Sequence, residues 1–514
     1  MLFTSYGFIA FLAVLFALYY LIPRKWQWLL LLAADIVFYA CAGWQGLVFM
    51  AATVTVSWAA TNLMGASLRR QKAFLASDEG KALSRPERKE YKKLEEKKRK
   101  RVFVLALLID LGILAALKYT NFVIFNFNSL FSAQLAAVDW VLPLGISFYT
   151  FQTVSYVIDV YWEKVEPERN ILKVALFTSF FPLLIQGPIS RFGDLKDTLF
   201  AEHKADFKQI SFGLQRILWG YFKKLVIADR LLVAVTALCG DPTAYSGAYV
   251  FLGAVFYAAE LYADFTGGID ITIGIAQVLG VSVKENFIRP YFSRNIAEYW
   301  RRWHISMGTW FKDYIFYPLS VAPWLLKLSK KARKSISDGF GKKLSVYVST
   351  IVTWFLTGLW HGAAWNFVVW GLYMAFFLIL EKLFLLPLLK KSRVLGHVYT
   401  MFLVIISFVI FSAADMADAG NVIAEMFGAG GLTAVSGESL YYLRSYAATL
   451  LIAVLGSLPV VRNLFASLEA KMQENRAVNV ICTVGEPLVL AALLILVTGY
   501  LVDGSFNPFL YFRF

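Results

Sequence analysis

Long runs of apolar residues recur from one end of the chain to the other, with few polar positions between them. An apolar run of about 18 residues is long enough for an α-helix to cross the hydrocarbon core of a bilayer. The runs begin near residues 5, 27, 46, 102, 140, 171, 210, 246, 344, 363, 398, 440 and 478. This pattern predicts an all-α polytopic membrane protein with roughly 11–13 membrane-embedded helices, some of them re-entrant.

Composition agrees with the pattern and limits the number of domains. The chain is 59% hydrophobic and 17% charged, whereas soluble domains are about 45–50% apolar and about 25% charged. Because no internal repeat and no soluble domain interrupts the runs, we expect one membrane domain over residues 1–514. The three cysteines, Cys41, Cys239 and Cys482, lie far apart without CxxC spacing, so they predict neither a metal site nor a disulfide framework.

Basic residues are concentrated in segments between the apolar runs. The net charge is +15, and the densest basic block is Arg69–Arg101, with smaller ones at Lys327–Lys343 and Lys390–Arg393. Basic segments between spans remain in the cytoplasm, so residues 69–101 are predicted to be a cytoplasmic segment. Nucleic-acid binding is an alternative for so basic a chain, but membrane topology already accounts for the charge.

Residues 253–373 differ from the rest because ionisable side chains stand among apolar ones. Glu260 and Asp264 are four residues apart, which places both carboxylates on one face of a helix. Arg289, Arg301 and Arg302 follow within a short aromatic stretch. Charges at membrane depth usually mark a functional cavity, and we take this segment as the catalytic core. The alternative is an interfacial helix whose arginines extend toward the lipid headgroups.

Two of the four histidines lie in apolar, tryptophan-rich segments. His304 ends the motif YWRRWH with Trp300, and His361 follows Trp360 in GLWHGAAW. His203 and His397 stand beside charged runs, where a solvated or interfacial position is expected. The glycines beside His361 allow another backbone or a ligand to approach it closely. Although a single buried histidine is more often structural, two in similar settings predict a shared site.

Several common catalytic motifs are missing from the sequence. It contains no GxSxG elbow, no HExxH zinc motif, no Walker A loop and no GxGxxG fingerprint, which argues against serine hydrolases, zinc proteases and ATPases. The remaining chemistry is proton transfer by histidine in a membrane cavity.

Five segments of the chain, in order, resemble the membrane-bound O-acyltransferases, and in particular the bacterial branch that O-acetylates alginate. The D-alanyl transferases of teichoic acid synthesis are relatives of that branch. The matching segments are Leu142–Tyr161, Ser179–Phe192, Glu285–Leu319, Leu356–Tyr373 and Asn507–Phe514.

The resemblance implies a helical bundle around a central tunnel, with His361 as the catalytic histidine and His304 as its second polar residue. His361 would act as general base on an acceptor hydroxyl, with a covalent acyl-histidine as the variant. The donor would be a cytoplasmic acyl thioester such as acetyl-CoA, used as substrate with no bound cofactor.

The resemblance also implies which residues meet the substrates and where the protein works. Arg289, Arg301 and Arg302 would hold the donor phosphates, and Trp300, Trp360, Glu260 and Asp264 complete the expected substrate-binding set. The location would be the bacterial inner membrane. The acceptor would be a secreted or surface polysaccharide, reached through an extracytoplasmic partner of the SGNH-hydrolase type.

Three other functions stay open at this point. A proton-coupled transporter or flippase would use Glu260, Asp264 and the histidines as a relay, although the missing repeat argues against it. A structural scaffold within a polysaccharide export complex would leave His361 replaceable. A lipid acyltransferase of the same family would keep the histidines and change the acceptor.

Overall fold

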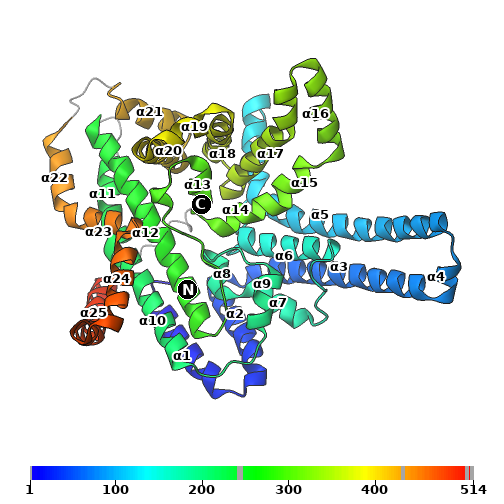
Figure 1. Ribbon diagram of the computed structural model, residues 1–514, viewed down its shortest axis with the longest axis horizontal. Helices are drawn as coiled ribbons and strands as arrows, with labels where there is room; N and C mark the ends of the chain where they lie inside the picture. Colours follow the sequence, from blue (N-terminus) through cyan, green and yellow to red (C-terminus); the bar gives the residue numbers. More distant parts are fainter. Residues whose placement is uncertain (1–2, 240–246, 430–434, 504–508, 510–514) are drawn as a thin grey trace. The chain divides into compact units, whose positions relative to one another are not determined.

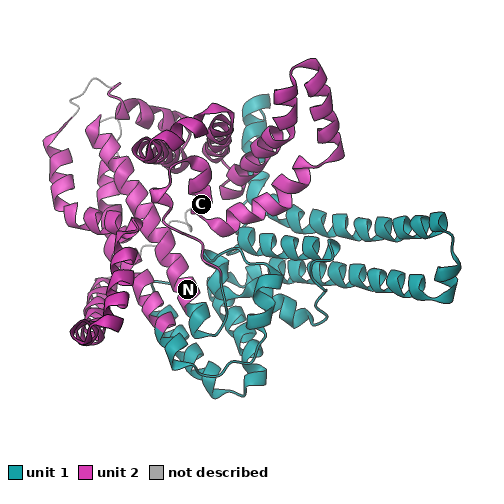
Figure 2. Cartoon of the chain, viewed as in Figure 1, with its two compact units in different colours: residues 1–211, 275–283 teal, residues 212–274, 284–514 magenta. Residues whose placement is uncertain are grey.

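The computed structural model describes residues 3–239, 247–429, 435–503 and 509, and in this part of the chain helices joined by loops are the regular structure, without a strand (Figure 1). The chain forms two compact units (Figure 2). Unit 1 comprises residues 1–211 and 275–283, and unit 2 comprises residues 212–274 and 284–514. The expectation of one membrane domain over residues 1–514 stays a prediction. Of the resembling segment 507–514, only Phe509 lies among the described residues.

Unit 1 contains nine helices in the residues that the structure describes. They are α1 (Tyr6–Leu21), α2 (Gln27–Gly43), α3 (Gln45–Ala76), α4 (Asp78–Ala82), α5 (Arg85–Phe131), α6 (Ile146–Tyr161), α7 (Ile171–Ser179), α8 (Phe181–Ile185) and α9 (Phe192–Leu199). Helices α3 and α5 lie side by side, and short α4 joins their ends (Figure 1). Helix α6 packs on both of them and is buried along almost its whole length.

Local sequence signals explain where these helices begin. Ser84 and Glu87 form a capping box at the start of α5, with Pro86 in its first turn, which satisfies amide groups that have no partner inside the helix. Polar side chains buried between helices find partners as well. Asp35 accepts hydrogen bonds from the Ser179 hydroxyl and the Phe181 amide, both at 2.9 Å. Unit 1 is therefore a helical core with paired buried polar groups.

Unit 2 carries the remaining helices and all the residues predicted for the site. Its longer helices are α10 (Phe207–Tyr221), α11 (Asp229–Cys239), α12 (Ala248–Val278), α16 (Pro323–Ser335), α17 (Asp338–His361), α18 (Trp365–Leu380), α20 (Arg393–Ser412), α21 (Met416–Met426), α23 (Ala447–Ser457), α24 (Val460–Glu474) and α25 (Arg476–Val502). Its shorter helices are α13 (Ile296–Trp300), α14 (Ile305–Phe311), α15 (Tyr317–Ser320), α19 (Leu386–Lys391) and α22 (Gly437–Ser445). The first residues of α10 and the last of α12 belong to unit 1.

Seven helices in the described residues are long and apolar enough to cross a bilayer, and the bent pair α22–α23 makes up to eight. This confirms the all-α polytopic class. Each predicted run falls on a helix, but several runs form shorter helices, such as α1, α7 and α8, that do not meet the length test. The count of roughly 11–13 membrane-embedded helices stays a prediction, because it would have to include short or broken helices in addition to these spans.

Candidate active site

The two tryptophan-flanked histidines meet in one aromatic cluster of unit 2. The ring of Trp360 lies 6.0 Å from the ring of His304 and 4.8 Å from that of His361, measured between centroids. The two imidazoles are thus no farther apart than the sum of these distances. A shared site for His304 and His361 was the prediction from sequence, and in the structure the rings of both residues contact Trp360.

His304 occupies the N-cap position of α14 in the left-handed backbone region, with φ 45° and ψ 53°. A non-glycine residue rarely adopts this conformation, and strain of this kind gathers at functional sites. The side chain is fully buried against Phe265 at 5.1 Å between ring centroids. Residue 304 lies outside the candidate membrane spans, and burial lowers its pKa to about 3. The imidazole is therefore neutral near pH 7.

The side-chain amide of Asn286 determines which nitrogen of His304 carries the proton. Asn286 Oδ1 accepts a hydrogen bond from the Ser306 amide at 2.9 Å, which fixes the orientation of the carboxamide. Its Nδ2 lies 3.2 Å from His304 Nδ1, closer than Oδ1 at 3.4 Å. Because an amide NH2 only donates, the shorter contact favours Nδ1 as the acceptor and thus the tautomer of the neutral ring with its proton on Nε2.

The opposite nitrogen of His304 has the properties of an available donor. Nε2 is buried and has no hydrogen-bond partner among the described residues. A buried donor without a partner is costly. A substrate atom could complete this hydrogen bond, so the geometry offers one N–H donor on the ring that contacts Trp360.

His361 is the last residue of α17, and small residues around it permit close packing. A Cβ on Gly358 would come within 2.3 Å of the Phe367 carbonyl oxygen, so glycine allows the backbone of α18 to approach, as the sequence indicated. Rings of Trp370 and Phe411 pack edge-on against His361 at 5.0 and 5.1 Å. The imidazole is partly buried and its Nε2 is inaccessible.

Trp300 belongs to the same cluster without touching either histidine in the described contacts. Its ring lies 4.5 Å from Trp354 and 5.7 Å from Trp370, and Trp370 in turn contacts His361. Of the predicted tryptophans, Trp360 therefore contacts both histidines, and Trp300 reaches His361 through Trp370.

The three predicted arginines have different surroundings. Arg302 forms an ion pair with Glu298 at 2.6 Å and donates to the carbonyls of Arg289 and Phe292 at 3.4 and 3.2 Å. Arg301 is exposed and makes no ion pair within the described residues. Arg289 has a left-handed backbone with φ 45°. Arg302 thus fixes the local chain, whereas Arg301 can meet a ligand.

The carboxylates of Glu260 and Asp264 lie one turn apart on α12 but face different groups. Asp264 is buried against Lys224, with Nζ to Oδ1 at 2.7 Å, and Lys224 also pairs with Asp229 at 2.9 Å. Glu260 is buried and lines a cavity of about 300 Å³ together with Tyr257 and Asp418. Asp264 therefore belongs to a buried ion-pair network, whereas the Glu260 carboxylate lines a cavity.

Four residues beside the predicted set were not singled out from sequence: Asn286, Lys224, Trp370 and Phe411. Asn286 and Lys224 act on partners 18 and 40 positions away, so no local motif marks the pairing. Trp370 and Phe411 resemble ordinary apolar helix residues in sequence. Within the described residues, no group of three or more His, Cys, Asp or Glu side chains has metal-ligand geometry.

Comparison with known proteins identifies the family. The profile of the membrane-bound O-acyltransferase family matches residues 167–416, which include both histidines. The probable alginate O-acetylase AlgI of Azotobacter vinelandii is 34% identical over 466 residues, covering 88% of this chain and 83% of the relative. The chain belongs to the membrane-bound O-acyltransferase family.

More distant relatives of this O-acyltransferase carry other acceptors in their names. The peptidoglycan O-acetyltransferase of Helicobacter pylori is 28% identical over 360 residues, covering 64% of this chain and 65% of the relative. The teichoic acid D-alanyltransferase of Bacillus subtilis is 27% identical over 284 residues, covering 52% and 68%. The protein is thus a multi-pass membrane acyltransferase.

Proposed function

We propose that this O-acyltransferase takes an acetyl group from a cytoplasmic thioester donor, acetyl-CoA, and delivers it to an extracytoplasmic acceptor. The final product is an O-acetylated secreted or surface polysaccharide, made at the bacterial inner membrane. The observation that carries the proposal is the pair of histidines around Trp360 in a chain related over most of its length to alginate O-acetylases.

His361 is the general base in this reaction. An acceptor hydroxyl gives its proton to the imidazole while its oxygen bonds to the thioester carbonyl carbon. The carbonyl electron pair moves onto oxygen and forms a tetrahedral oxyanion. When the oxyanion collapses, the carbon–sulfur bond breaks and the thiolate takes the proton from the imidazolium. An ester and a free thiol leave the site, and the histidine is neutral again.

His304 stabilises the oxyanion. Its Nε2–H is buried and is directed by the Asn286 contact on Nδ1. A fixed donor in a dry site is worth about 10²–10³ in rate when it faces the developing negative charge. Both imidazoles contact Trp360, and in the proposal His361 takes the proton while His304 stabilises the charge.

The remaining predicted residues have supporting roles in the proposal. Arg301 and Arg289 contact the donor phosphates, since Arg302 is already paired with Glu298. Glu260, on the wall of its cavity, accepts hydrogen bonds from acceptor hydroxyls. An SGNH-type partner outside the membrane receives the acetyl group and completes the transfer to the polysaccharide. Asp264 serves the ion-pair network with Lys224.

The test compares cells that carry wild type, His361→Ala or His397→Gln at matched membrane levels. His397 is a histidine of the same unit that contacts the Ser293 carbonyl and lies outside the cluster. We expect His361→Ala to remove ester-linked acetate from the surface polysaccharide, and His397→Gln to retain it. Size-exclusion profiles of the purified variants verify folding.

Two outcomes would overturn the proposal. Unchanged acetate in the His361→Ala cells would return His361 to a packing role and favour a transporter or scaffold. Loss of acetate from the lipid fraction, with the polysaccharide unaffected, would identify a lipid acyltransferase instead.

A further inference from the structure

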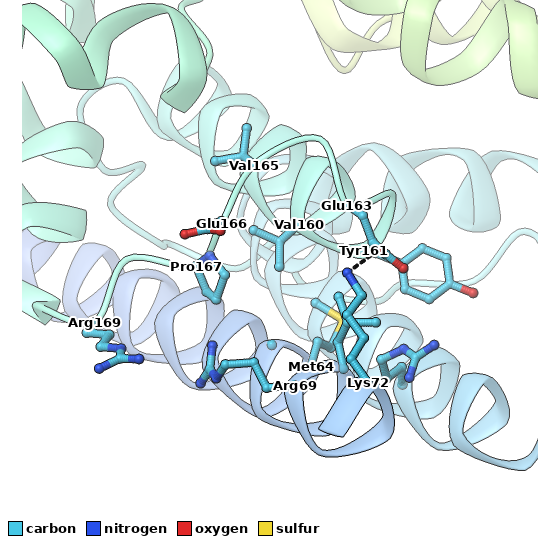
Figure 3. Close-up of a pocket in the computed structure, with 13 residues that line it drawn as sticks. Met64, Arg69, Lys72, Val160, Tyr161, Glu163, Val165, Glu166, Pro167 and Arg169 are labelled. Atoms are coloured by element: carbon cyan, nitrogen blue, oxygen red, sulfur yellow. Dashed lines mark hydrogen bonds and ion pairs between the residues drawn. The ribbon is translucent and has the colours of Figure 1, made fainter. Parts of the chain in front are cut away.

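Unit 1 contains a cavity that the acyl-transfer chemistry does not use. It has a volume of about 350 Å³ and is lined by α3, the end of the basic part of α5, the end of α6 and the following loop (Figure 3). Four cationic side chains line it, Arg69, Lys72, Arg99 and Arg169, against two carboxylates, Glu163 and Glu166. The lining therefore carries a net positive charge.

Most of that positive charge is not neutralised by protein carboxylates. Lys72 forms an ion pair with Glu163 at 3.1 Å, which accounts for one charge of each sign. Arg99 donates to the neutral Gln71 side chain. Within the described residues, Arg69 and Arg169 form no ion pair or side-chain hydrogen bond. Arg69 and Arg169 line one cavity without a carboxylate partner, and guanidinium groups of this kind are suited to bidentate binding of phosphate.

The loop that closes the cavity is held in a defined position. Trp58 Nε1 donates to the Arg169 carbonyl at 3.0 Å, and Asn62 Nδ2 donates to the Glu168 carbonyl at 2.8 Å. Gly65 on α3 lets the loop approach, since a Cβ there would lie 2.4 Å from Pro167 Cγ. Because these contacts fix the loop against α3, the shape of the cavity is set by the fold, as well as its charge.

The position of the cavity along the helices places it at the cytoplasmic membrane interface. Helix α3 changes from apolar to basic at Arg69, and α5 changes from basic to apolar just after Arg99. Both changes occur at the cavity wall. A ligand here meets lipid headgroups on one side and the cytoplasm on the other.

We propose that this cavity, formed by Arg69, Arg99 and Arg169 under the 163–169 loop, is a binding site for a phosphate-bearing ligand. The shared chemistry is a phosphate group that accepts hydrogen bonds from arginines. Its source is either an anionic phospholipid of the inner leaflet or a soluble phosphorylated molecule of the cytoplasm.

The experiment uses the full-length protein and two probes that separate these sources. Native mass spectrometry of protein released from nanodiscs counts retained phosphatidylglycerol, with phosphatidylcholine nanodiscs as reference. Equilibrium dialysis of detergent-solubilised protein measures binding of ADP. The double variant Arg69→Gln/Arg169→Gln is compared with Lys92→Gln/Lys93→Gln, which removes the same charge from exposed residues of α5 outside the cavity.

We expect the cavity variant to weaken binding of at least one probe about tenfold or more, and the matched surface variant to change it less than twofold. Glu166→Gln removes a repelling carboxylate and should strengthen binding. Gly65→Ala keeps the charge but displaces the loop, so it should weaken binding. Equal losses in both double variants, or binding of neither probe by wild type, would overturn the site.

Discussion

At the scale of single residues, Asn286 is the group that sets the chemistry of His304. Replacing it by aspartate keeps the oxygen that accepts from Ser306 but removes the NH2 that donates to Nδ1. The carboxylate favours a proton on Nδ1, so the neutral ring loses its Nε2–H donor. We predict that Asn286→Asp lowers kcat about 10²–10³-fold near pH 7 and leaves donor KM nearly unchanged, measured by steady-state acetyl transfer.

The pH dependence distinguishes this role from a structural one. An adjacent carboxylate raises the pKa of His304, and below that raised pKa both ring nitrogens carry protons. The Nε2–H donor then returns, so the ratio of variant to wild-type kcat should rise as pH falls. Asn295→Asp, which keeps the side-chain cap of α13, is the matched control. A ratio that does not vary with pH would contradict the tautomer argument.

Replacement by glutamine should affect stability at one of two adjacent arginines and the KM for the donor at the other. Arg302 is paired with Glu298 and two carbonyls, so Arg302→Gln should cost about 1–2 kcal/mol of stability with little change in KM. Arg301 is exposed, so Arg301→Gln should raise the apparent KM for acetyl-CoA about fivefold with normal folding. Initial rates at varied donor concentration, with thermal midpoints of both variants, measure the two effects. A raised KM in Arg302→Gln alone would reverse the assignment.

At the scale of helices, the site depends on close packing of α17 against α18. A Cβ on Gly371 would lie 2.2 Å from the Trp354 carbonyl oxygen, and Gly358 faces the Phe367 carbonyl in the same way. We predict that Gly371→Ala separates the helices, shifts Trp370 away from His361, lowers the thermal midpoint by several degrees and abolishes acetyl transfer. Fluorescence-detected thermal unfolding in detergent measures the midpoint.

A second glycine provides the control for that prediction. Gly112 lies in α5, and a Cβ there meets no atom within 4 Å, so Gly112→Ala should keep or slightly raise the midpoint through helix propensity. If both substitutions change the thermal midpoint in the same way, the effect at Gly371 would come from helix propensity, and the close contact with Trp354 would not contribute.

Sequence patterns predicted the existence of helices better than their continuity. The run near residue 171 divides into α7 and α8 at Phe180, close to Pro182, which cannot continue a helix with normal bonding. The run near residue 210 contains a π-helical turn at Phe222–Ala228, where Lys224 reaches Asp264. Hydropathy does not encode such a tertiary ion pair.

The same limit applies to the candidate site. His304 and His361 could be predicted because tryptophans and glycines mark both locally in the sequence. Asn286 could not be predicted, because it contacts His304 from 18 positions away in the sequence, and the segment between them is irregular. Likewise, the four-residue spacing of Glu260 and Asp264 predicted that both lie on one face of a helix. Only the structure shows that Glu260 lines a cavity whereas Asp264 forms an ion pair with Lys224.

At the scale of the whole molecule, the direction of acyl transfer depends on orientation in the membrane. Helix α5 has 47 residues, about 70 Å at 1.5 Å per residue, whereas the hydrocarbon core is about 30 Å thick. Its basic first half must therefore extend beyond the membrane, and the positive-inside rule predicts that this half lies in the cytoplasm, the compartment of the proposed thioester donor.

Cysteine accessibility at the two ends of α5 tests this orientation. In a chain whose cysteines at 41, 239 and 482 are replaced by alanine, Lys89→Cys marks the basic half and Gln134→Cys follows the apolar end; both positions are exposed. A membrane-impermeant maleimide should label residue 134 in intact spheroplasts, and residue 89 only in inverted vesicles. The reverse pattern would place the basic segment outside and would contradict this orientation of α5.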